Sequence, residues 1–266
     1  MALIFTDLIA IGKQSRVNIT KLTEEIIEGK GYVVLPDLLS PAEVQEARDL
    51  ILKLASQERN HLKLIIKRRK ERLHGLIYKG DIFSKLVGEK LIIKLVEEIL
   101  GKDMILAGFS AHILHSNAKR MGVHVDYPYW AMPSPYPLHP ILEIQVIWMI
   151  DDFTANNGAT LFAAGTQKLA TKPDYKKFEQ IAQKITGKAG TAIVSHGLCW
   201  HDTSENKSDR LRTSVLGSYT PQYIHPLENN SHDFDRQTFD NFTPRLKKLL
   251  RHTSISNRSA FDMKYL

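Results

Sequence analysis

The spacing of apolar residues predicts two helices in the N-terminal part of the chain. The first would begin at Ser40, which is a suitable N-cap, and Glu43 would complete a capping box with it. Apolar residues then recur at helical intervals. The second helix is expected over residues 89–100, with Gly101 as a natural stop. A short strand, residues 32–35, is expected to precede both helices.

From about residue 104 onward the pattern becomes that of short strands. Apolar and β-branched runs alternate with turn sequences; the runs are "MILAGFSAHIL", "ILEIQVIWMI", "ATLFAAG", "GTAIVSHG" and "LRTSVLGSY". Short strands at such spacing are typical of a sandwich or barrel. We therefore predict a mainly β protein with helices, forming a single domain over residues 1–266. It would comprise a helical N-terminal layer at about 1–103, a β core at about 104–222 and a polar tail at 223–266 with one short helix around "RLKKLLR".

The composition fits a folded protein with a substantial core. Hydrophobic residues make up 43% of the 266 residues, and charged residues make up 24%. Because Cys199 is the one cysteine, an internal disulfide is impossible, and we expect a reducing, cytoplasmic setting. No basic residue precedes the short apolar run at the N-terminus, so we expect no secretory signal. No segment reaches the length of a membrane span.

A basic stretch, residues 63–80, carries much of the formal net charge of +7. Such a stretch could bind nucleic acid or an anionic substrate. It is better explained as the solvated face of a helix, because apolar residues lie among the charges. No nucleic-acid-binding motif accompanies it, so we do not expect a nucleic-acid partner.

The sequence His124-Val-Asp126 suggests part of a metal site. Residues two apart on a strand point to the same face, so the imidazole and the carboxylate would converge. Two histidines and one carboxylate on one face of Fe(II) leave three positions open for a cosubstrate and O₂. Taken alone, the pair is better explained as a local hydrogen bond on a strand, since the chain has 11 histidines and 29 acidic residues. A metal site would need a third ligand from a later strand.

His201 is the best candidate for the third ligand. A polar turn follows it and leads into a strand that opens with Arg212. An arginine entering a buried strand needs a partner. The far carboxylate of a metal-bound dicarboxylate would supply one, because the planar guanidinium binds a carboxylate through two hydrogen bonds. Arg210 is the alternative anchor, and His196 is the alternative ligand. The other downstream histidines lie in a proline-rich loop or in the polar tail: His139, His225, His232 and His252.

With these residues identified, the sequence resembles the phytanoyl-CoA dioxygenase family of Fe(II)/2-oxoglutarate oxygenases. The resemblance covers roughly residues 28–222. "GYVVLPDLLSPAEVQEAR" and "LIIKLVEEILGKD" match the elements before the core, and "DDFTANNGATLFAAGTQK" matches the segment between the ligands. The resemblance implies a double-stranded β-helix, that is, a jelly-roll or cupin-like core flanked by N-terminal helices. It also implies that His124, Asp126 and His201 bind Fe(II), and that Arg212 binds 2-oxoglutarate, which is consumed with O₂.

Two features depart from the family pattern. Ala164-Gly165-Thr166-Gln167 stands where the family usually has Pro-Gly-Ser-His, a motif that holds no metal. The loop "AMPSPYPLHP" after His-x-Asp is long and proline-rich, so the wall of the pocket is expected to be individual. The presence of Asp126 favours hydroxylation or desaturation, because related halogenases replace this carboxylate by a small residue.

Further residues near the expected site are weaker candidates. Thr203, Ser214 and Gln145 could hydrogen-bond 2-oxoglutarate, but each could instead be an ordinary structural polar residue. The aromatic residues that follow the His-x-Asp pair could line the substrate pocket or simply pack in the core: Tyr127, Tyr129 and Trp130.

Together these features predict an Fe(II)- and 2-oxoglutarate-dependent dioxygenase. It would hydroxylate or desaturate a small organic substrate in secondary or specialised metabolism and release succinate and CO₂. The basic charge weakly favours an anionic or carrier-linked substrate. Two alternatives stay open: a metal-dependent cupin-type enzyme that does not use 2-oxoglutarate, and a non-catalytic basic binding module. The identity of the substrate and the oligomeric state cannot be read from the sequence.

Overall fold

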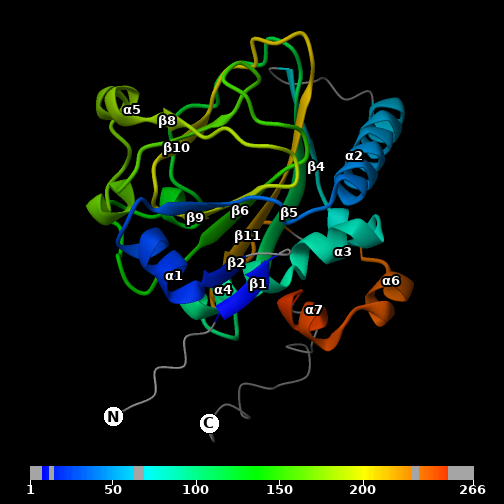
Figure 1. Cartoon of the computed structure of the whole chain (residues 1–266), viewed down its shortest axis with the longest axis horizontal. Coiled ribbons are helices and arrows are strands. Elements are labelled where there is room, and N and C mark those ends of the chain that lie inside the picture. The colour runs from blue at the N-terminus through cyan, green and yellow to red at the C-terminus, as the bar shows by residue number, and fades with distance from the viewer. Residues whose placement is uncertain (1–7, 12–14, 63–68, 229–233, 251–266) are drawn as a thin grey trace, which may run out of the picture.

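Two antiparallel sheets face each other in the computed structural model of the chain, which describes residues 8–11, 15–62, 69–228 and 234–250 (Figure 1). The larger sheet has six strands, in the order β3 (Tyr32–Leu35), β9 (Ala192–His196), β6 (Ile144–Met149), β11 (Arg212–Thr220), β5 (Ile105–Leu114) and β4 (Lys70–Leu73). The smaller sheet has the order β10 (His201–Thr203), β7 (Thr160–Phe162) and β8 (Gln183–Lys184). A separate antiparallel pair comprises β1 (Leu8–Ile11) and β2 (Ser15–Asn18).

The two N-terminal helices form where their capping signals lie. The helix α2 (Pro41–Leu62) follows Ser40, whose backbone N–H donates to Oε2 of Glu43 at 2.8 Å. The helix α4 (Lys90–Leu100) ends at Gly101, whose φ of 83° is a conformation that favours glycine. Within the described residues, no helix is long and apolar enough to cross a membrane. The remaining helices are α1 (Ile19–Ile27), α3 (Asp81–Val87), α5 (Tyr175–Ile181), α6 (Arg236–Asn241) and α7 (Pro244–Leu249), of which α7 matches the short helix predicted in the tail.

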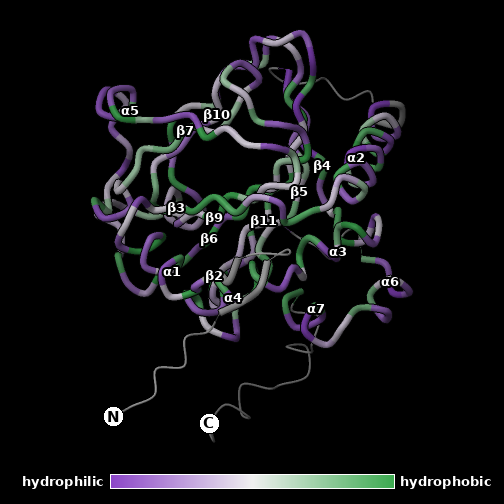
Figure 2. The backbone as a smooth tube through the Cα atoms, in the orientation of Figure 1, coloured by the Kyte–Doolittle hydropathy of each residue, from purple (hydrophilic) through white to green (hydrophobic). Residues whose placement is uncertain are grey.

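Alternation along its strands gives the larger sheet two different faces. On one face apolar side chains, such as Val146 and Trp148 of β6, pack with α1 to α4 in one core. On the other face β11 presents Arg212, Ser214 and Ser218 toward the smaller sheet. In Figure 2 the apolar colour runs through the central strands, whereas α5 on the outside is polar. Because residues two apart on a strand share a face, the same strands build both the core and a polar cavity.

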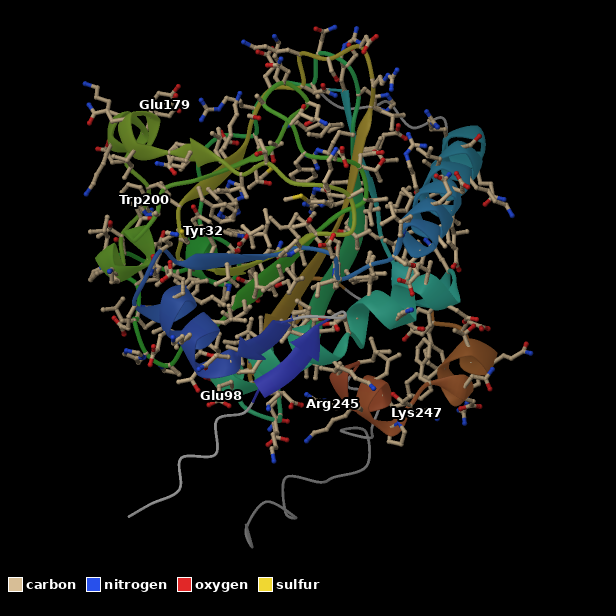
Figure 3. The ribbon with its side chains drawn as sticks, in the orientation of Figure 1. Tyr32, Glu98, Glu179, Trp200, Arg245 and Lys247 are labelled. Atoms are coloured by element: carbon tan, nitrogen blue, oxygen red, sulfur yellow. The ribbon has the colours of Figure 1, made fainter. Side chains whose placement is uncertain are left out.

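Aromatic packing holds the two sheets together at one end. The ring of Tyr32 on β3 stacks on that of Phe162 on β7, with centroids 4.8 Å apart. Tyr32 lies in the interior in Figure 3, whereas the charged side chains of Glu179 and Lys247 lie at the periphery. Ile147 and Ile193 of the larger sheet belong to the same apolar cluster. This cluster closes one end of the space between the sheets and leaves the polar end near β11 and β5.

The described part of the basic stretch, residues 69–80, is not the helix that its composition favoured. It contains β4, which pairs with β5, and a 3₁₀ turn, η2 (Leu76–Tyr78). Residues 63–68 lie outside the described ranges. The strands β3 and β4, which both precede residue 104, form the two edges of the larger sheet. The division into a helical layer, a β core and a tail within one domain stays a prediction.

Candidate active site

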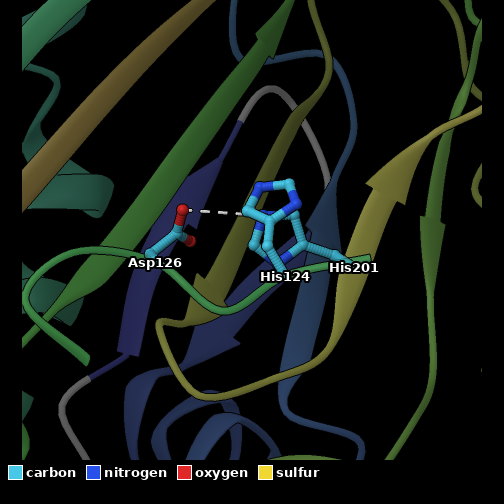
Figure 4. Close-up of side chains that lie close together, drawn as sticks. All are labelled: His124, Asp126 and His201. Carbon is cyan, nitrogen blue, oxygen red and sulfur yellow. Dashed lines mark ion pairs between the residues drawn. The ribbon is translucent and has the colours of Figure 1, made fainter. Parts of the chain in front are cut away.

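Two separate segments bring three polar side chains together between the sheets (Figure 4). One potential ligand atom from each of His124, Asp126 and His201 lies within 4.8 Å of the others. Nε2 of His201 is 3.5 Å from Oδ1 of Asp126, and the centroids of the two imidazole rings are 4.2 Å apart. In the part of the chain that the structure describes, no other group of three His, Cys, Asp or Glu side chains meets in this way. The three residues singled out from the sequence are therefore neighbours in space.

Backbone pairing, and not a strand of its own, positions the His-x-Asp segment. His124 forms an isolated antiparallel bridge with His201: its N–H donates to the carbonyl of His201 at 3.0 Å, and the reverse bond measures 3.1 Å. The N–H of Asp126 donates to the carbonyl of Gly197 at 2.8 Å. The expectation that His124 and Asp126 share a regular strand is thus wrong, because a single bridge to β10 replaces it. The side chains nevertheless converge, since both are fixed against the same partner segment.

Each imidazole ring is oriented by a hydrogen bond within its own segment. Nδ1 of His124 lies 2.8 Å from the carbonyl of Gly122, and Nδ1 of His201 lies 2.9 Å from that of Cys199. A carbonyl oxygen only accepts, so both Nδ1 atoms carry a proton, and in the neutral form of each ring it is Nε2 that keeps the lone pair. Burial, aided by the neighbouring ring of His201, lowers the pKa of His124 to about 4, which makes it neutral at pH 7. This tautomer and this charge are those of a metal-binding histidine.

Asp126 supplies the negative charge of the group. Its burial raises the carboxyl pKa, but the rings of His201 and His124 outweigh that effect and the net pKa is lowered. The pKa of His201 shows the matching balance, because burial lowers it and the carboxylate of Asp126 raises it by more. Oδ2 of Asp126 is buried and accepts no hydrogen bond within the described chain. A buried anionic oxygen without a donor is costly unless a cation binds it, so two imidazoles and this carboxylate fit an Fe(II) ion.

Asp202 braces the loop that leads into His124. Its carboxylate accepts hydrogen bonds from the backbone N–H groups of residues 121–122 at 3.1 and 3.0 Å. It also accepts from Nε of Arg120 at 2.8 Å and from the N–H of Thr203 at 2.7 Å. The side chain of Asp202 is fully buried, which strengthens its hydrogen bonds. Asp202, which directly follows His201, thereby fixes the segment that carries His124.

The segment that departs from the family pattern has a structural role. Nε2 of Gln167 donates to the carbonyls of Ile27 and Gly29, both at 3.1 Å, which ties this turn to the end of α1. The hydroxyl of Thr166 donates to the carbonyl of Ala163 at 2.7 Å and accepts from the N–H of Trp200 at 2.9 Å. These bonds fix the chain immediately before His201. The replacement therefore keeps a positioning function without contributing to the metal group.

A cavity of about 380 Å³ lies beside the three side chains. The inner faces of β4, β5, β6 and β11 form one wall, and β7 and β10 form the opposite wall. Most of the side chains predicted to surround the site line this cavity: Arg212, Thr203, Ser214, Gln145, Tyr127 and Trp130. Tyr129 does not, because it is fully buried behind the wall, where its hydroxyl accepts from the N–H of Leu142 at 2.8 Å.

Arg212 is a buried cation in the wall of the cavity. Its guanidinium donates from Nη1 to Oγ of Ser214 at 2.7 Å and from Nη2 to the carbonyl of Gly158 at 2.5 Å. It also lies 4.2 Å from the ring centroid of Phe153. Burial lowers the pKa of Arg212 to about 9, so it is still charged at pH 7. Among the described residues it forms no ion pair, whereas Arg210, the alternative anchor, is exposed and lines a different groove.

Two other predicted residues are held by the protein itself. The amide nitrogen of Gln145, oriented by its surroundings, donates to Oε1 of Glu143 at 3.2 Å and to the carbonyl of Gly217 at 3.1 Å. His196, the alternative ligand, is buried on β9, and its Nδ1 accepts from the N–H of Leu198 at 3.0 Å. His196 is therefore a satisfied core histidine that does not belong to the metal group.

Strand pairing adds cavity residues that the sequence did not single out. In the register of the larger sheet, Ser214 pairs with His112, and His112 pairs with Arg72. Burial, reinforced by the two neighbouring arginines, keeps the pKa of His112 well below its usual value, so this imidazole is neutral. Glu143 lies buried nearby, and burial followed by the charge of Asp126 holds its pKa well above the usual range. The alternation of charged residues in "KERLH" was the one signal that could have pointed to Arg72.

Comparison with known proteins agrees with this geometry. The sequence profile described as phytanoyl-CoA dioxygenase matches residues 27–214, which is more than half of the chain. The chain belongs to the phytanoyl-CoA dioxygenase family. It is therefore a dioxygenase that depends on Fe(II), 2-oxoglutarate and O₂, and the members of this family act on small molecules. The class of enzyme and the cofactors predicted from the sequence are confirmed.

Several curated relatives of this family member carry names of oxidative enzymes. The Aspergillus fumigatus protein named dioxygenase af480 is 26% identical over 244 residues, which cover 89% of this chain and 78% of that protein. The L-proline trans-4-hydroxylase of Streptomyces griseoviridis is 23% identical over 232 residues, which cover 74% of this chain and 86% of that protein.

Solved structures of the same architecture confirm the jelly-roll fold. HygX from Streptomyces hygroscopicus, solved with nickel and 2-oxoglutarate bound, matches with a TM-score of 0.61 at 12% identity, over 77% of this chain and 88% of that one. The non-heme α-ketoglutarate-dependent epimerase SnoN matches with a TM-score of 0.58 at 17% identity, over 76% of this chain and 82% of that one. At these identities the likeness establishes the fold, and the antiparallel sheets do not close into a barrel within the described ranges.

Proposed function

We propose that His124, Asp126 and His201 bind the ferrous ion, through Nε2 of each imidazole and the carboxylate of Asp126. The observation that carries this proposal is the state of the other ring nitrogens. Both Nδ1 atoms are already engaged by backbone carbonyls, so the groups left to bind a cation are the two Nε2 atoms and the partnerless Oδ2 of Asp126. Three protein ligands leave room on the metal for a cosubstrate and for O₂.

Arg212 binds the distal carboxylate of 2-oxoglutarate in this proposal. Its guanidinium is charged, lines the cavity and forms no ion pair among the described residues. Ser214 and the carbonyl of Gly158 fix its plane, which reduces the conformational entropy lost when a carboxylate binds. Thr203 on the opposite wall and Ser214 beside the guanidinium supply further hydroxyls to the cosubstrate. Gln145 is oriented by Glu143 and lines the same cavity.

The reaction we propose is hydroxylation or desaturation of a small organic molecule, as part of specialised metabolism. Iron with 2-oxoglutarate supplies activation of O₂ with release of succinate and CO₂. The protein holds the substrate beside the metal group and keeps bulk water out through the residues that line the mouth of the cavity, which include Tyr127 and Trp130. Support comes from relatives that are named as dioxygenases and as a proline hydroxylase.

The test of this proposal starts from metal-free protein under anaerobic conditions. Fe(II) and then 2-oxoglutarate are added while visible absorption is recorded, and O₂ is then admitted while succinate is measured. We expect an absorption band that requires both Fe(II) and 2-oxoglutarate, followed by succinate release. An Asp126→Ala protein is expected to show neither signal. A wild-type protein that binds Fe(II) but shows no response to 2-oxoglutarate would refute the proposed roles of the metal group and of Arg212.

A further inference from the structure

The cavity contains a second guanidinium that the roles above do not use. Arg72, on the edge strand β4, lines the cavity together with Arg212. Its neighbour in the sheet, His112, lies between the two arginines, and both lower its pKa. Arg72 and Asp126 line the same cavity, and the charge of Arg72 contributes to the lowered pKa of Asp126. One cationic group is therefore available for the cosubstrate and another for a second anion.

The hydrogen-bond donors of Arg72 have no partner among the described residues. Its side chain makes no hydrogen bond or ion pair there, although Glu228 lies close enough to influence its pKa. The carboxylate of Glu228 is already committed. Oε1 lies 2.9 Å from Nδ1 of His74, and Oε2 accepts from the N–H of Phe109 at 2.9 Å. The carboxylates of Glu228 and Asp126 therefore act on the charge of Arg72 from a distance, but neither forms a hydrogen bond with its guanidinium.

Arg72 lines the cavity and keeps accessible surface. The side chain is exposed, yet desolvation by the surrounding protein lowers its pKa, against the opposing effects of Glu228 and Asp126. The guanidinium therefore lines the cavity, is accessible to a ligand and is partly shielded from bulk water by the surrounding protein. Within such a site, a guanidinium recognises a carboxylate or phosphate more strongly than it does in bulk water.

Exposed apolar side chains also line this cavity. Three large side chains that line it are unusually exposed: Met121 at 47%, Trp130 at 55% and Leu227 at 47%. They come from different segments, and Trp130 lies beside the ring of Tyr127, with centroids 5.8 Å apart. Exposed apolar side chains gathered around a pocket mark a place where a ligand covers them. A ligand that pairs with the guanidinium of Arg72 and also covers these apolar side chains has an acidic group and an apolar body.

We propose that Arg72 binds the acidic group of the primary substrate, and that this substrate is an organic acid whose apolar body rests on Met121, Trp130 and Leu227. This inference rests on the proposed function, because it places the substrate beside the metal group and assigns Arg212 to 2-oxoglutarate. It makes Arg72 a specificity-determining residue. A neutral analogue of the substrate would leave the guanidinium without a partner and would bind more weakly.

The experiment compares acids with their neutral isosteres. Protein loaded with Zn(II) and 2-oxoglutarate is titrated with 4-phenylbutyrate, indole-3-propionate and octanoate, and with the primary amide of each, and binding is followed by ligand-observed NMR. We expect at least one acid to bind about tenfold more tightly than its amide. Arg72→Met and Arg72→Gln are expected to abolish this preference, and Arg72→Lys is expected to keep part of it. Arg210→Met, which removes an exposed arginine outside the cavity, is the matched control and should retain it.

Two results would overturn the inference. One is an absence of any acid preference in the wild-type protein, or a preference that persists in Arg72→Met. The other is a loss of 2-oxoglutarate affinity in Arg72→Met as large as that in Arg212→Met, because Arg72 would then hold the cosubstrate. Binding of Zn(II) and 2-oxoglutarate to the wild type is measured first. If it fails, the proposed function is refuted, and the comparison of acids with amides on metal-free protein still decides the role of Arg72.

Discussion

The backbones of His124 and His201 hydrogen-bond to each other in both directions, at 3.0 and 3.1 Å. This pairing joins the loop before η3 (Tyr129–Ala131) to the start of β10. Each ring is then fixed by a carbonyl of its own segment, that of Gly122 or that of Cys199. The positions and tautomers of both imidazoles are therefore set by the fold, as the proposed metal site requires.

Removal of a ligand side chain should abolish metal binding before it affects folding. We expect His124→Ala and Asp126→Ala to lose more Fe(II) affinity than the roughly ten- to hundredfold that follows loss of a hydrogen bond to a ligand. Succinate release should fall to background. The check is an Fe(II) titration together with a succinate assay, and His139→Ala, an exposed histidine of the proline-rich loop, is the control. Full turnover by either ligand variant would exclude the proposed metal site.

Substitution of Arg212 should act on the cosubstrate. Arg212→Met is expected to raise the KM for 2-oxoglutarate about tenfold or more, because hydrogen bonds to a charged group contribute about 1.5–3 kcal/mol. Arg212→Lys should recover only part of this, since an ammonium cannot reproduce the planar pair of bonds. Steady-state kinetics at varied 2-oxoglutarate concentration measure the effect. Arg210→Met serves as the control, and an equal change in that variant would transfer the anchor role to Arg210.

Local signals made the core elements predictable. The capping box at Ser40 and the stop at Gly101 act within one turn of helix, so they specify α2 and α4 without reference to the rest of the chain. The long buried strands β5, β6, β9 and β11 each coincide with an apolar run. The strand β4 was missed because "KERL" is charged on both sides of its alternation: Arg72 lines a polar cavity, and Glu71 on the opposite face pairs with Arg59 and His115.

The proximity of the three candidate ligands could be expected from the sequence motif and the family resemblance, but their surroundings could not. The sequence itself shows the spacing of four residues: His124, Asp126, His201 and Arg212. The first three lie together in the structure. Their neighbours are determined by the register between strands far apart in the chain, such as the pairing that sets Arg72 beside His112. A single sequence does not contain that register. For the same reason, the sequence alone does not show that His124 forms an isolated bridge with His201.

Asp202 offers a test of how the loop before His124 is held. The carboxylate of Asp202 accepts from several donors, including the N–H groups of residues 121–122. An asparagine would replace one accepting oxygen by an NH₂ group, which is itself a donor and cannot accept these bonds. We expect Asp202→Asn to lower the free energy of unfolding by about 1–3 kcal/mol and Fe(II) affinity by roughly ten- to hundredfold. Urea denaturation of the metal-free protein and Fe(II) titration measure the two effects. Asp209→Asn, at an exposed position, is the control, and unchanged metal affinity in Asp202→Asn would show that the loop is held by other contacts.

The pH dependence of stability should reveal the buried state of His196. Burial, with the nearby charge of His139, lowers the pKa of His196 to about 4, from about 6.5 in the unfolded chain. As the pH falls below about 6.5, His196 binds a proton in the unfolded state but not in the folded state. The free energy of unfolding therefore decreases progressively until the pH reaches the folded pKa. A shift of this size corresponds to about 3 kcal/mol. His196→Gln removes the titration and keeps an oxygen that can accept from the N–H of Leu198.

The comparison of wild type with His196→Gln isolates this one group. His124 also becomes harder to protonate on folding, and Glu143 acts with the opposite sign at higher pH, because its raised pKa makes the folded state bind the extra proton. Both residues are present in both proteins, so their contributions cancel in the difference. Urea unfolding of the metal-free proteins between about pH 7 and pH 4.5 should show the wild type losing more stability than the variant, by an amount approaching about 3 kcal/mol. Parallel curves would mean that His196 takes up its proton as easily in the folded protein as in the unfolded one.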